Sequence, residues 1–427
     1  MVNSDAMSIT GTASSDELLT AQEASGLLGI KPATLYTYVS RGLLQPVCDV
    51  YRKEHRYHRD ELERLRLRSG GRMAQGAVAA GAMRWGQPVM DTAITEIGVD
   101  GPRYRGHLAT DLVRHPGVYE NVAELLWSGV LTDTPHAWAV DVPQVDLMRA
   151  LDAMLQRNRE RPRMLRVFSI VAAALGGGTL AEELRSGSIE RYSRQMLFAF
   201  AGGCGVLGPM GNYVAPEGER PLAQHVLHAL GAEPSEAAEF AVNAALILGA
   251  DHELSTATFA ARVAASAGAT LHACIVAAQA TLQGTALAGG ADAAEDFLCS
   301  IGSRAELDTR LADVEQRRQR LAGFGLPIYP QGDPRAALMI DLAQRAAPGS
   351  ARAELAYQFV ERVRDRLGLQ PNIEMGLVVL GVAWGLPPRS PSALWGIGRT
   401  AGWIAHVMEQ RLAGYTIRPR GLYQSRR

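Results

Sequence analysis

The sequence has few cysteines and no long unbroken apolar run. Its four cysteines, Cys48, Cys204, Cys274 and Cys299, lie far apart and form no C-x-x-C pair. This argues against a zinc site or a disulfide framework and suits a reducing cytoplasm. The uncharged stretch 196–216 is interrupted by Gly, Pro and Asn, which favours a closely packed buried segment over a membrane span. The N-terminal residues carry acids and no apolar segment, unlike a secretory signal. We therefore expect a cytoplasmic protein with no membrane partner and no metal.

An excess of charge of either sign is also lacking. The net charge of the 427 residues is −1, so the whole molecule has no field that attracts nucleic acid. Any binding of DNA must come from a local patch. A hydrophobic content of 47% with 20% charged residues is typical of a folded protein, and the length predicts two or three domains.

The composition changes near residue 70 and divides the chain. Residues 1–15 read as a disordered tail and 16–68 as a small domain, in which residues 41–68 carry eight Arg/Lys against five Asp/Glu. The stretch RSGGRMAQG begins a linker that we place at 69–84. Beyond it, apolar residues recur at i, i+3 and i+4, as in AAEFAVNAALILGADHE (237–253). This pattern predicts a body that is almost entirely helical.

The segment 16–68 carries the signals of two short helices. Thr20 and Glu23 form a capping box that starts the first helix, Gly29 ends it, and Pro32 begins the second. A basic segment ending RYHRDELERLRLR follows. This is the helix-turn-helix plan with a winglike extension, and it resembles the small MerR-type or excisionase-type DNA-binding domains.

In that plan the second helix enters the major groove and the wing contacts the backbone. DNA is therefore a predicted partner. The competing interpretation is a helical adaptor that packs only on protein. The DNA-binding candidates are Lys31, Thr34, Tyr36, Thr37, Arg41, Arg52, Lys53 and Arg56.

Separated motifs in the body point to one family. They include ADHELSTATFAARVAASAGA (250–269), GFGLPIYPQGDPRAA (323–337), PNIEMGLVVLGVAWGLP (371–387) and GRTAGWIAHVMEQ (398–410). In this order they resemble the citrate synthase family. The resemblance implies an all-α, two-domain dimer, with a large domain at 85–288 and 386–427 and a small domain at 289–385 that closes over the substrate.

The family condenses an acyl-CoA with oxaloacetate by means of two histidines and an aspartate. At the matching positions this chain has Ala288, Leu326 and Glu374. Neither alanine nor leucine can exchange a proton. Glu374 keeps a carboxylate, but its extra methylene displaces the charge by about one bond length.

The residues that grip the acid are retained in the resemblance. His252 matches the substrate-binding histidine, Arg335 and Arg399 match the carboxylate-binding arginines, and Arg418 matches the arginine that reaches across the dimer. A guanidinium suits a carboxylate because it offers two parallel charge-assisted hydrogen bonds. Without the family context each of these residues has a structural alternative, such as a core histidine or a solvated ion pair. His272 and His406 we interpret as structural.

These residues favour a carboxylate-binding protein that lacks both catalytic histidines. It would act as a sensor through its helix-turn-helix domain, or as a subunit that pairs with an active relative. The alternative is an acyl-CoA:oxaloacetate acyltransferase, or a lyase running in reverse, with Glu374 as the base. We predict no bound cofactor, an acyl-CoA as co-substrate or ligand in either case, and a homodimer or heteromer.

Overall fold

The computed structural model describes residues 18–28, 30–40, 44, 46–49, 54–59, 62, 90–136, 138, 140, 162–185, 188–284, 289–347 and 349–419. The predicted tail at 1–15 and linker at 69–84 lie outside these residues. The chain divides into two compact units, one formed by Met1–Asp91 with Pro419–Arg427 and the other by Thr92–Arg418. We call the second unit the body.

The N-terminal unit joins two short helices to a small antiparallel sheet. Its strands have the order β1-β3-β2. The predicted capping box is confirmed: the Thr20 N–H donates to Glu23 Oε2 at 2.8 Å, and the Glu23 N–H donates to Thr20 Oγ1 at 3.3 Å. The predicted start of the second helix at Pro32 is also confirmed. The elements are β1 (Leu18–Thr20), α1 (Ala21–Leu28), α2 (Pro32–Ser40), β2 (Val47–Asp49) and β3 (Glu54–His58).

This unit has its own core of Ala24, Leu35, Leu44, Tyr57 and Leu62. Because helices and sheet both supply buried side chains, the strands that follow α2 are part of the fold and not an appendage.

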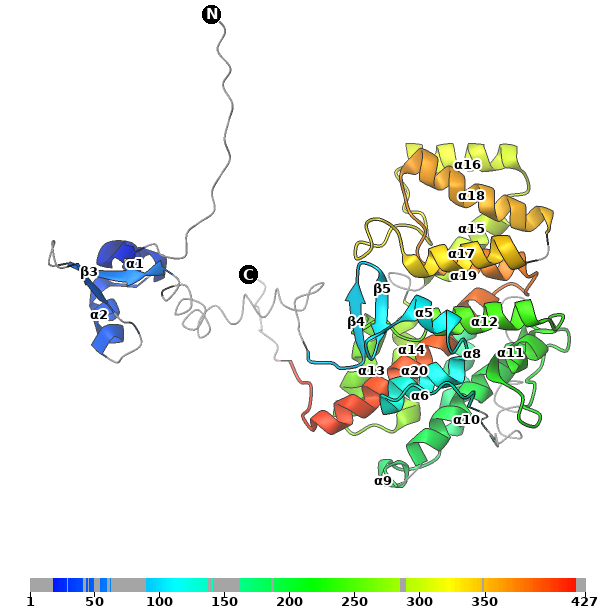
Figure 1. The fold of residues 1–427 in the computed structure, drawn as a ribbon, viewed down its shortest axis with the longest axis horizontal. Coiled ribbons are helices and arrows are strands. Elements are labelled where there is room, and N and C mark those ends of the chain that lie inside the picture. The colour runs from blue at the N-terminus through cyan, green and yellow to red at the C-terminus, as the bar shows by residue number, and fades with distance from the viewer. Residues whose placement is uncertain are drawn as a thin grey trace, which may run out of the picture. The chain divides into compact units, whose positions relative to one another are not determined.

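The body is mostly helical, as predicted, with one small antiparallel sheet that the sequence pattern did not predict (Figure 1). Its elements are β4 (Thr95–Gly98), β5 (Gly101–Tyr104), β6 (His107–Leu108), α5 (Ala109–Arg114), α6 (Tyr119–Ser128), α8 (Met164–Leu175), α9 (Leu180–Glu183), α10 (Ser188–Gly203), the 3-10 helix η1 (Cys204–Val206), α11 (Leu222–Leu230), α12 (Glu236–Leu248), α13 (Thr256–Ser266), α14 (Leu271–Leu282), α15 (Gly289–Cys299), α16 (Arg304–Gln316), α17 (Pro334–Ala346), α18 (Ala351–Leu367), α19 (Ile373–Ala383) and α20 (Ser390–Ala413).

Helix α20 is the centre of the larger of two cores in the body. It is buried over most of its length and packs against α6, α8, α10, α12, α13, α14 and α19. Two glycines allow this packing. A methyl group on Gly398 would lie 2.9 Å from the Leu246 carbonyl oxygen, and one on Gly402 would lie 2.5 Å from the Ala250 carbonyl oxygen. The end of α12 and the loop after it therefore approach α20 closely.

A second core lies within residues 294–383 and is built from α15, α16, α17, α18 and α19, with α18 contributing the most buried side chains. Helices α17 and α19 contribute buried side chains to both cores. Figure 1 shows them beneath α16 and α18, on the side that faces α5 and α12. The predicted small domain at 289–385 covers this core, and its boundaries stay a prediction.

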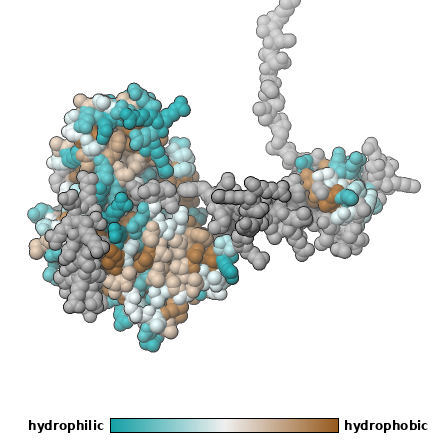
Figure 2. All heavy atoms as spheres, turned by 180° about the vertical axis from the view of Figure 1, so that it is seen from behind, coloured by the Kyte–Doolittle hydropathy of each residue, from teal (hydrophilic) through white to brown (hydrophobic). Residues whose placement is uncertain are grey.

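The surface over the outer helices of the second core is polar. Figure 2 shows hydrophilic residues gathered over the end of the body where Figure 1 places α16 and α18. Within the described ranges, no helix combines the length and the apolarity that crossing a membrane requires.

Candidate functional site

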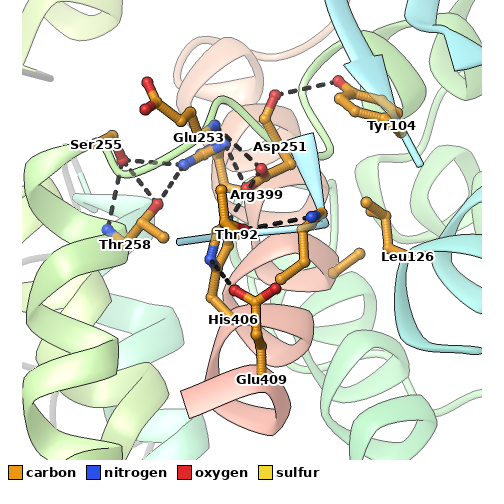
Figure 3. Close-up of polar contacts among 12 residues, drawn as sticks. Thr92, Tyr104, Leu126, Asp251, Glu253, Ser255, Thr258, Arg399, His406 and Glu409 are labelled. Carbon is orange, nitrogen blue, oxygen red and sulfur yellow. Dashed lines mark hydrogen bonds and ion pairs between the residues drawn. The ribbon is translucent and has the colours of Figure 1, made fainter. Parts of the chain in front are cut away.

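The centre of the site is an ion pair between α20 and the loop after α12 (Figure 3). Arg399 and His406 lie on one face of α20 because they are seven residues, or two turns, apart. Arg399 Nη1 donates to Asp251 Oδ1 at 3.2 Å, and His406 Nε2 lies 3.2 Å from Asp251 Oδ2. Arg399 Nη2 donates to Ser255 Oγ at 3.0 Å and to Thr258 Oγ1 at 2.8 Å. His406, which we had interpreted as structural, thus holds a site carboxylate.

Asp251 is fully buried and is positioned by its backbone as well as its side chain. The Tyr104 hydroxyl donates to the Asp251 carbonyl at 3.2 Å and to the Ile247 carbonyl at 3.0 Å, which fixes the loop to the end of α12. A methyl group on Gly402 would lie 2.2 Å from Asp251 Oδ1. Burial alone would raise the pKa of Asp251, but His406 and Arg399 hold it below its ordinary value. The carboxylate is therefore charged, and it neutralises Arg399.

The polar network continues from His406 away from the site. Glu409 Oε2 lies 4.0 Å from His406 Nδ1 and accepts a hydrogen bond from Arg262 Nη1 at 2.6 Å. Glu409 Oε1 accepts from the Ala93 N–H at 2.8 Å. Ala93 lies two residues after Asp91, where the division between the units falls. A chain of buried and half-buried charges thus links Arg399 to the first residues of the body.

The second arginine, Arg335, lies in the first turn of α17 and forms an ion pair with Asp333, two residues before it. Its Nε and Nη2 donate to the two carboxylate oxygens of Asp333, at 2.9 and 2.8 Å. Asp333 is also the N-cap of α17 and accepts from the Ile373 N–H at 3.1 Å. Arg335 Nη1 is buried and has no hydrogen-bond partner among the described residues.

His252 is close enough to both arginines for their charges to act on its pKa. Its Nε2 is 3.1 Å from the hydroxyl of Tyr329, and the two rings meet edge to face at 5.8 Å and 73°. Burial lowers the pKa of His252 well below its ordinary value, and the charges of Arg335 and Arg399 lower it further. The imidazole is therefore neutral near pH 7.

The structure thus brings together three of the four predicted binding residues. Our prediction assigned Arg335 and Arg399 to ligand carboxylates and named no partner for them within the chain. In the structure Asp333 accepts from Nε and Nη2 of Arg335, whereas Asp251, Ser255 and Thr258 accept from the two terminal nitrogens of Arg399. With His252 neutral, the charges of Arg335 and Arg399 are matched by those of Asp333 and Asp251.

Glu374 lies in the first turn of α19, after the N-cap Asn372, and is 8% exposed. Its carboxylate packs on the first turn of α15, where a methyl group on Gly290 would lie only 1.9 Å from Oε2. Burial raises the pKa of Glu374 from 4.5 to about 7, against the opposing effects of Arg320, Asn372 and Arg335. The carboxyl group therefore exchanges its proton near neutral pH.

The other candidate residues of the body are Leu326, Ala288 and Arg418. Leu326 is half-buried, and its carbonyl accepts a hydrogen bond from the Tyr329 N–H at 2.9 Å. Ala288 lies outside the described residues. Arg418 is exposed and follows α20. In the described part of the chain, no cluster of His, Cys, Asp and Glu is arranged to hold a metal ion.

The DNA-binding candidates fall around α2. Lys31 and Tyr36 are exposed, and Thr34 is half-buried, while Leu35 points into the core. Arg56 lies on β3 and is half-buried. Arg41, Arg52, Lys53 and the side chain of Thr37 lie outside the described residues, so their role stays a prediction.

Asp251, Asp333 and Tyr329 are among the residues of the site that were not predicted. Asp251 and Asp333 stand inside the motifs ADHE and DPR. A buried arginine requires a partner, so acids beside His252 and Arg335 were the available signal. Tyr329 had no comparable signal, because its contact with His252 joins residues 77 positions apart.

Comparisons with known proteins agree with this architecture. Residues 82–420 match the family described as citrate synthase, C-terminal domain, and residues 18–69 match a helix-turn-helix domain. The 2-methylcitrate synthase of Shewanella oneidensis is 28% identical over 364 residues, which cover 82% of this chain and 96% of that protein. Citrate synthase 2 of Bacillus subtilis is 29% identical over 49% of this chain and 58% of that protein.

Solved structures show the same fold. The citrate synthase of the archaeon Thermoplasma acidophilum, in ternary complex with carboxymethyl coenzyme A and oxaloacetate, covers 80% of this chain and 94% of its own chain. Its TM-score is 0.67 at 23% identity. The citrate synthase of Thermotoga maritima has a TM-score of 0.65 at 21% identity.

Proposed function

The chain belongs to the citrate synthase family, and on that premise we propose that its body binds a small di- or tricarboxylic acid without ordinary citrate synthesis. One observation carries the proposal. Arg335 keeps a buried Nη1 without a partner among the described residues, close enough to His252 to lower its pKa, while position 326 is a leucine. The chain therefore retains hydrogen-bond donors for a carboxylate, but at position 326 it lacks an imidazole that could move a proton.

The size of the catalytic loss supports this reading. Removing one positioned acid or base typically costs about 10²–10⁴-fold in rate, and removing an enolate or oxyanion donor about 10²–10³-fold. Such losses do not simply multiply, because members of one unit fail together. A single loss of this size lowers a median turnover of about 10 s⁻¹ to about 10⁻³–10⁻¹ s⁻¹.

An acid of the oxaloacetate or citrate kind fits the retained donors. The related enzyme from Thermoplasma acidophilum is described in complex with oxaloacetate. Because Asp251 and Asp333 balance the two buried arginines, a di- or tricarboxylate needs one more cation. Arg418 of a second copy is our candidate, and this requires a dimer of the chain or a heteromer with an active relative. A CoA thioester is a further candidate ligand.

We infer from the N-terminal unit that acid binding in the body changes the affinity of the protein for DNA. Exposed Lys31 directly precedes α2, and exposed Tyr36 lies on this helix. In the helix-turn-helix plan this helix enters the major groove. The polar chain from Arg399 through Asp251, His406 and Glu409 reaches the Ala93 N–H, close to where the chain leaves the N-terminal unit. A dimer with two such units would bind a two-fold symmetric DNA site.

The alternative is an enzyme of the same acyl-CoA condensation class that uses Glu374 as its base. The specific observation in its favour is the pKa of Glu374, which burial raises to about 7. A general base is most effective when its pKa lies near the working pH. Such an enzyme would act on a more acidic acyl-CoA, or would run the cleavage direction.

Calorimetric titration of the purified chain with oxaloacetate and with citrate tests the proposed function. We expect saturable binding of at least one acid, and loss of binding when Arg399 is replaced in a folded Arg399→Lys variant. Absence of binding at millimolar acid would refute the proposal. Release of free thiol from acetyl-CoA or propionyl-CoA during the same titration would favour the enzyme instead.

A further inference from the structure

Tyr329 is held in the site by the loop that carries Leu326. The Tyr329 N–H donates to the Leu326 carbonyl at 2.9 Å, and the Gly332 N–H donates to the Tyr329 carbonyl at 3.0 Å. These two turns direct the side chain inward, where it is 3% exposed. The guanidinium of Arg335 lies 5.7 Å from the centre of its ring. Cation–π contact and the paired turns fix the position of the hydroxyl.

The hydroxyl meets His252, which comes from a different part of the body. Tyr329 lies in the loop between α16 and α17, and His252 lies in the loop between α12 and α13. Their polar atoms are 3.1 Å apart. Burial raises the pKa of Tyr329 to about 12, and burial lowers the pKa of His252. Both groups are therefore neutral, although the charge of Arg335 acts on both of them and that of Arg399 acts on His252.

Neutral and charged donors suit different atoms of a ligand. A guanidinium binds a carboxylate best, because both partners carry charge. A phenol hydroxyl and a neutral imidazole suit a carbonyl or hydroxyl oxygen. A buried polar pair also rejects a ligand that lacks such an oxygen, because its own atoms would then be left unpaired.

We propose that Tyr329 determines which acids the site accepts. Together with His252 it binds the keto or hydroxyl oxygen on the ligand's central carbons, while Arg335 and Arg399 bind the carboxylates. The site thereby selects oxo and hydroxy acids over plain di- and tricarboxylates of the same size. This inference rests on the proposed function, since it assigns the specificity of the same site.

Two matched pairs of acids test the inference. Citrate and tricarballylate differ only in the hydroxyl group, and oxaloacetate and succinate differ only in the keto oxygen. Calorimetry on the full chain should give a preference of about tenfold or more for the oxygenated member of each pair. In Tyr329→Phe that preference should fall by about tenfold, through weaker binding of citrate and oxaloacetate alone.

Controls separate specificity from structure. Tyr357→Phe removes a hydroxyl from α18 and should leave every affinity unchanged. His252→Gln is a second variant, which should lose the same preference if Tyr329→Phe does not fold. An unchanged preference in folded Tyr329→Phe overturns the inference, and so does an equal loss for all four acids. If the wild-type chain binds none of them, the proposed function itself fails.

Discussion

Replacing Arg335 by lysine tests whether its unpaired Nη1 is the anchor for a ligand carboxylate. Lysine keeps a positive charge beside Asp333, so the buried carboxylate is not left alone. The backbone N–H groups of Arg335 and Ile373 continue to donate to Asp333 in the variant. What lysine removes is the guanidinium fork and the buried Nη1.

The expected loss follows from one charge-assisted hydrogen bond. Hydrogen bonds to charged groups contribute about 1.5–3 kcal/mol. This corresponds to an affinity about 10- to 150-fold weaker for citrate and oxaloacetate. Stability should fall by only about 1 kcal/mol, because one of the two side-chain bonds to Asp333 is lost while the ion pair remains.

Calorimetry with citrate gives the affinity, and thermal unfolding shows that the variant is folded. Arg345→Lys is the matched control, since Arg345 lies on the same helix, is 77% exposed and pairs with Asp341. That change should alter neither affinity nor stability. If folded Arg335→Lys binds citrate within about twofold of wild type, the assignment of Arg335 as the anchor is wrong.

Three further predictions follow from the site and the N-terminal unit. Burial raises the pKa of Glu374 from 4.5 to about 7. The stability gained from the neutral carboxyl group is therefore complete below about pH 4.5 and is lost as pH rises through about 7. In urea unfolding, the stability of Glu374→Gln relative to wild type should therefore rise by about 2.5 kcal/mol between pH 5 and 8, and a difference that does not change with pH would contradict the burial. Gly290→Ala places a methyl group 1.9 Å from Glu374 Oε2 and should cost about 1–3 kcal/mol, whereas Gly177→Ala, with nothing within 4 Å, should cost little. Lys31→Ala should weaken binding to DNA upstream of the chain's own coding region and reduce the slope of log K against log salt concentration by about 1. If the wild-type protein does not bind this DNA at low salt, the N-terminal unit is an adaptor that packs on protein.

Local signals in the sequence predicted local structure well. The Thr20–Glu23 capping box and the helix start at Pro32 depend on residues a few positions apart, and both are confirmed. The helical body and its family were also recognised. The β4–β6 sheet was missed, because its strands are only two to four residues long and show no alternation of apolar and polar residues.

The electrostatics of the site could not be predicted in the same way. Arg399 and Asp251 are 148 positions apart, and their pairing depends on Gly402 admitting the loop to α20. The raised pKa of Glu374 arises from burial against Gly290, which no local pattern encodes. Residue types were readable from the sequence, but the charge balance between them required the tertiary fold.

Release of free thiol by the unmodified chain, supplied with acetyl-CoA and oxaloacetate, tests the central claim most directly. If the site holds a carboxylic acid but lacks the imidazoles that move protons, the thiol signal should not exceed the background of a reaction without protein, below or above pH 7. Turnover at about 1–10³ s⁻¹, the range of ordinary enzymes, would contradict the account.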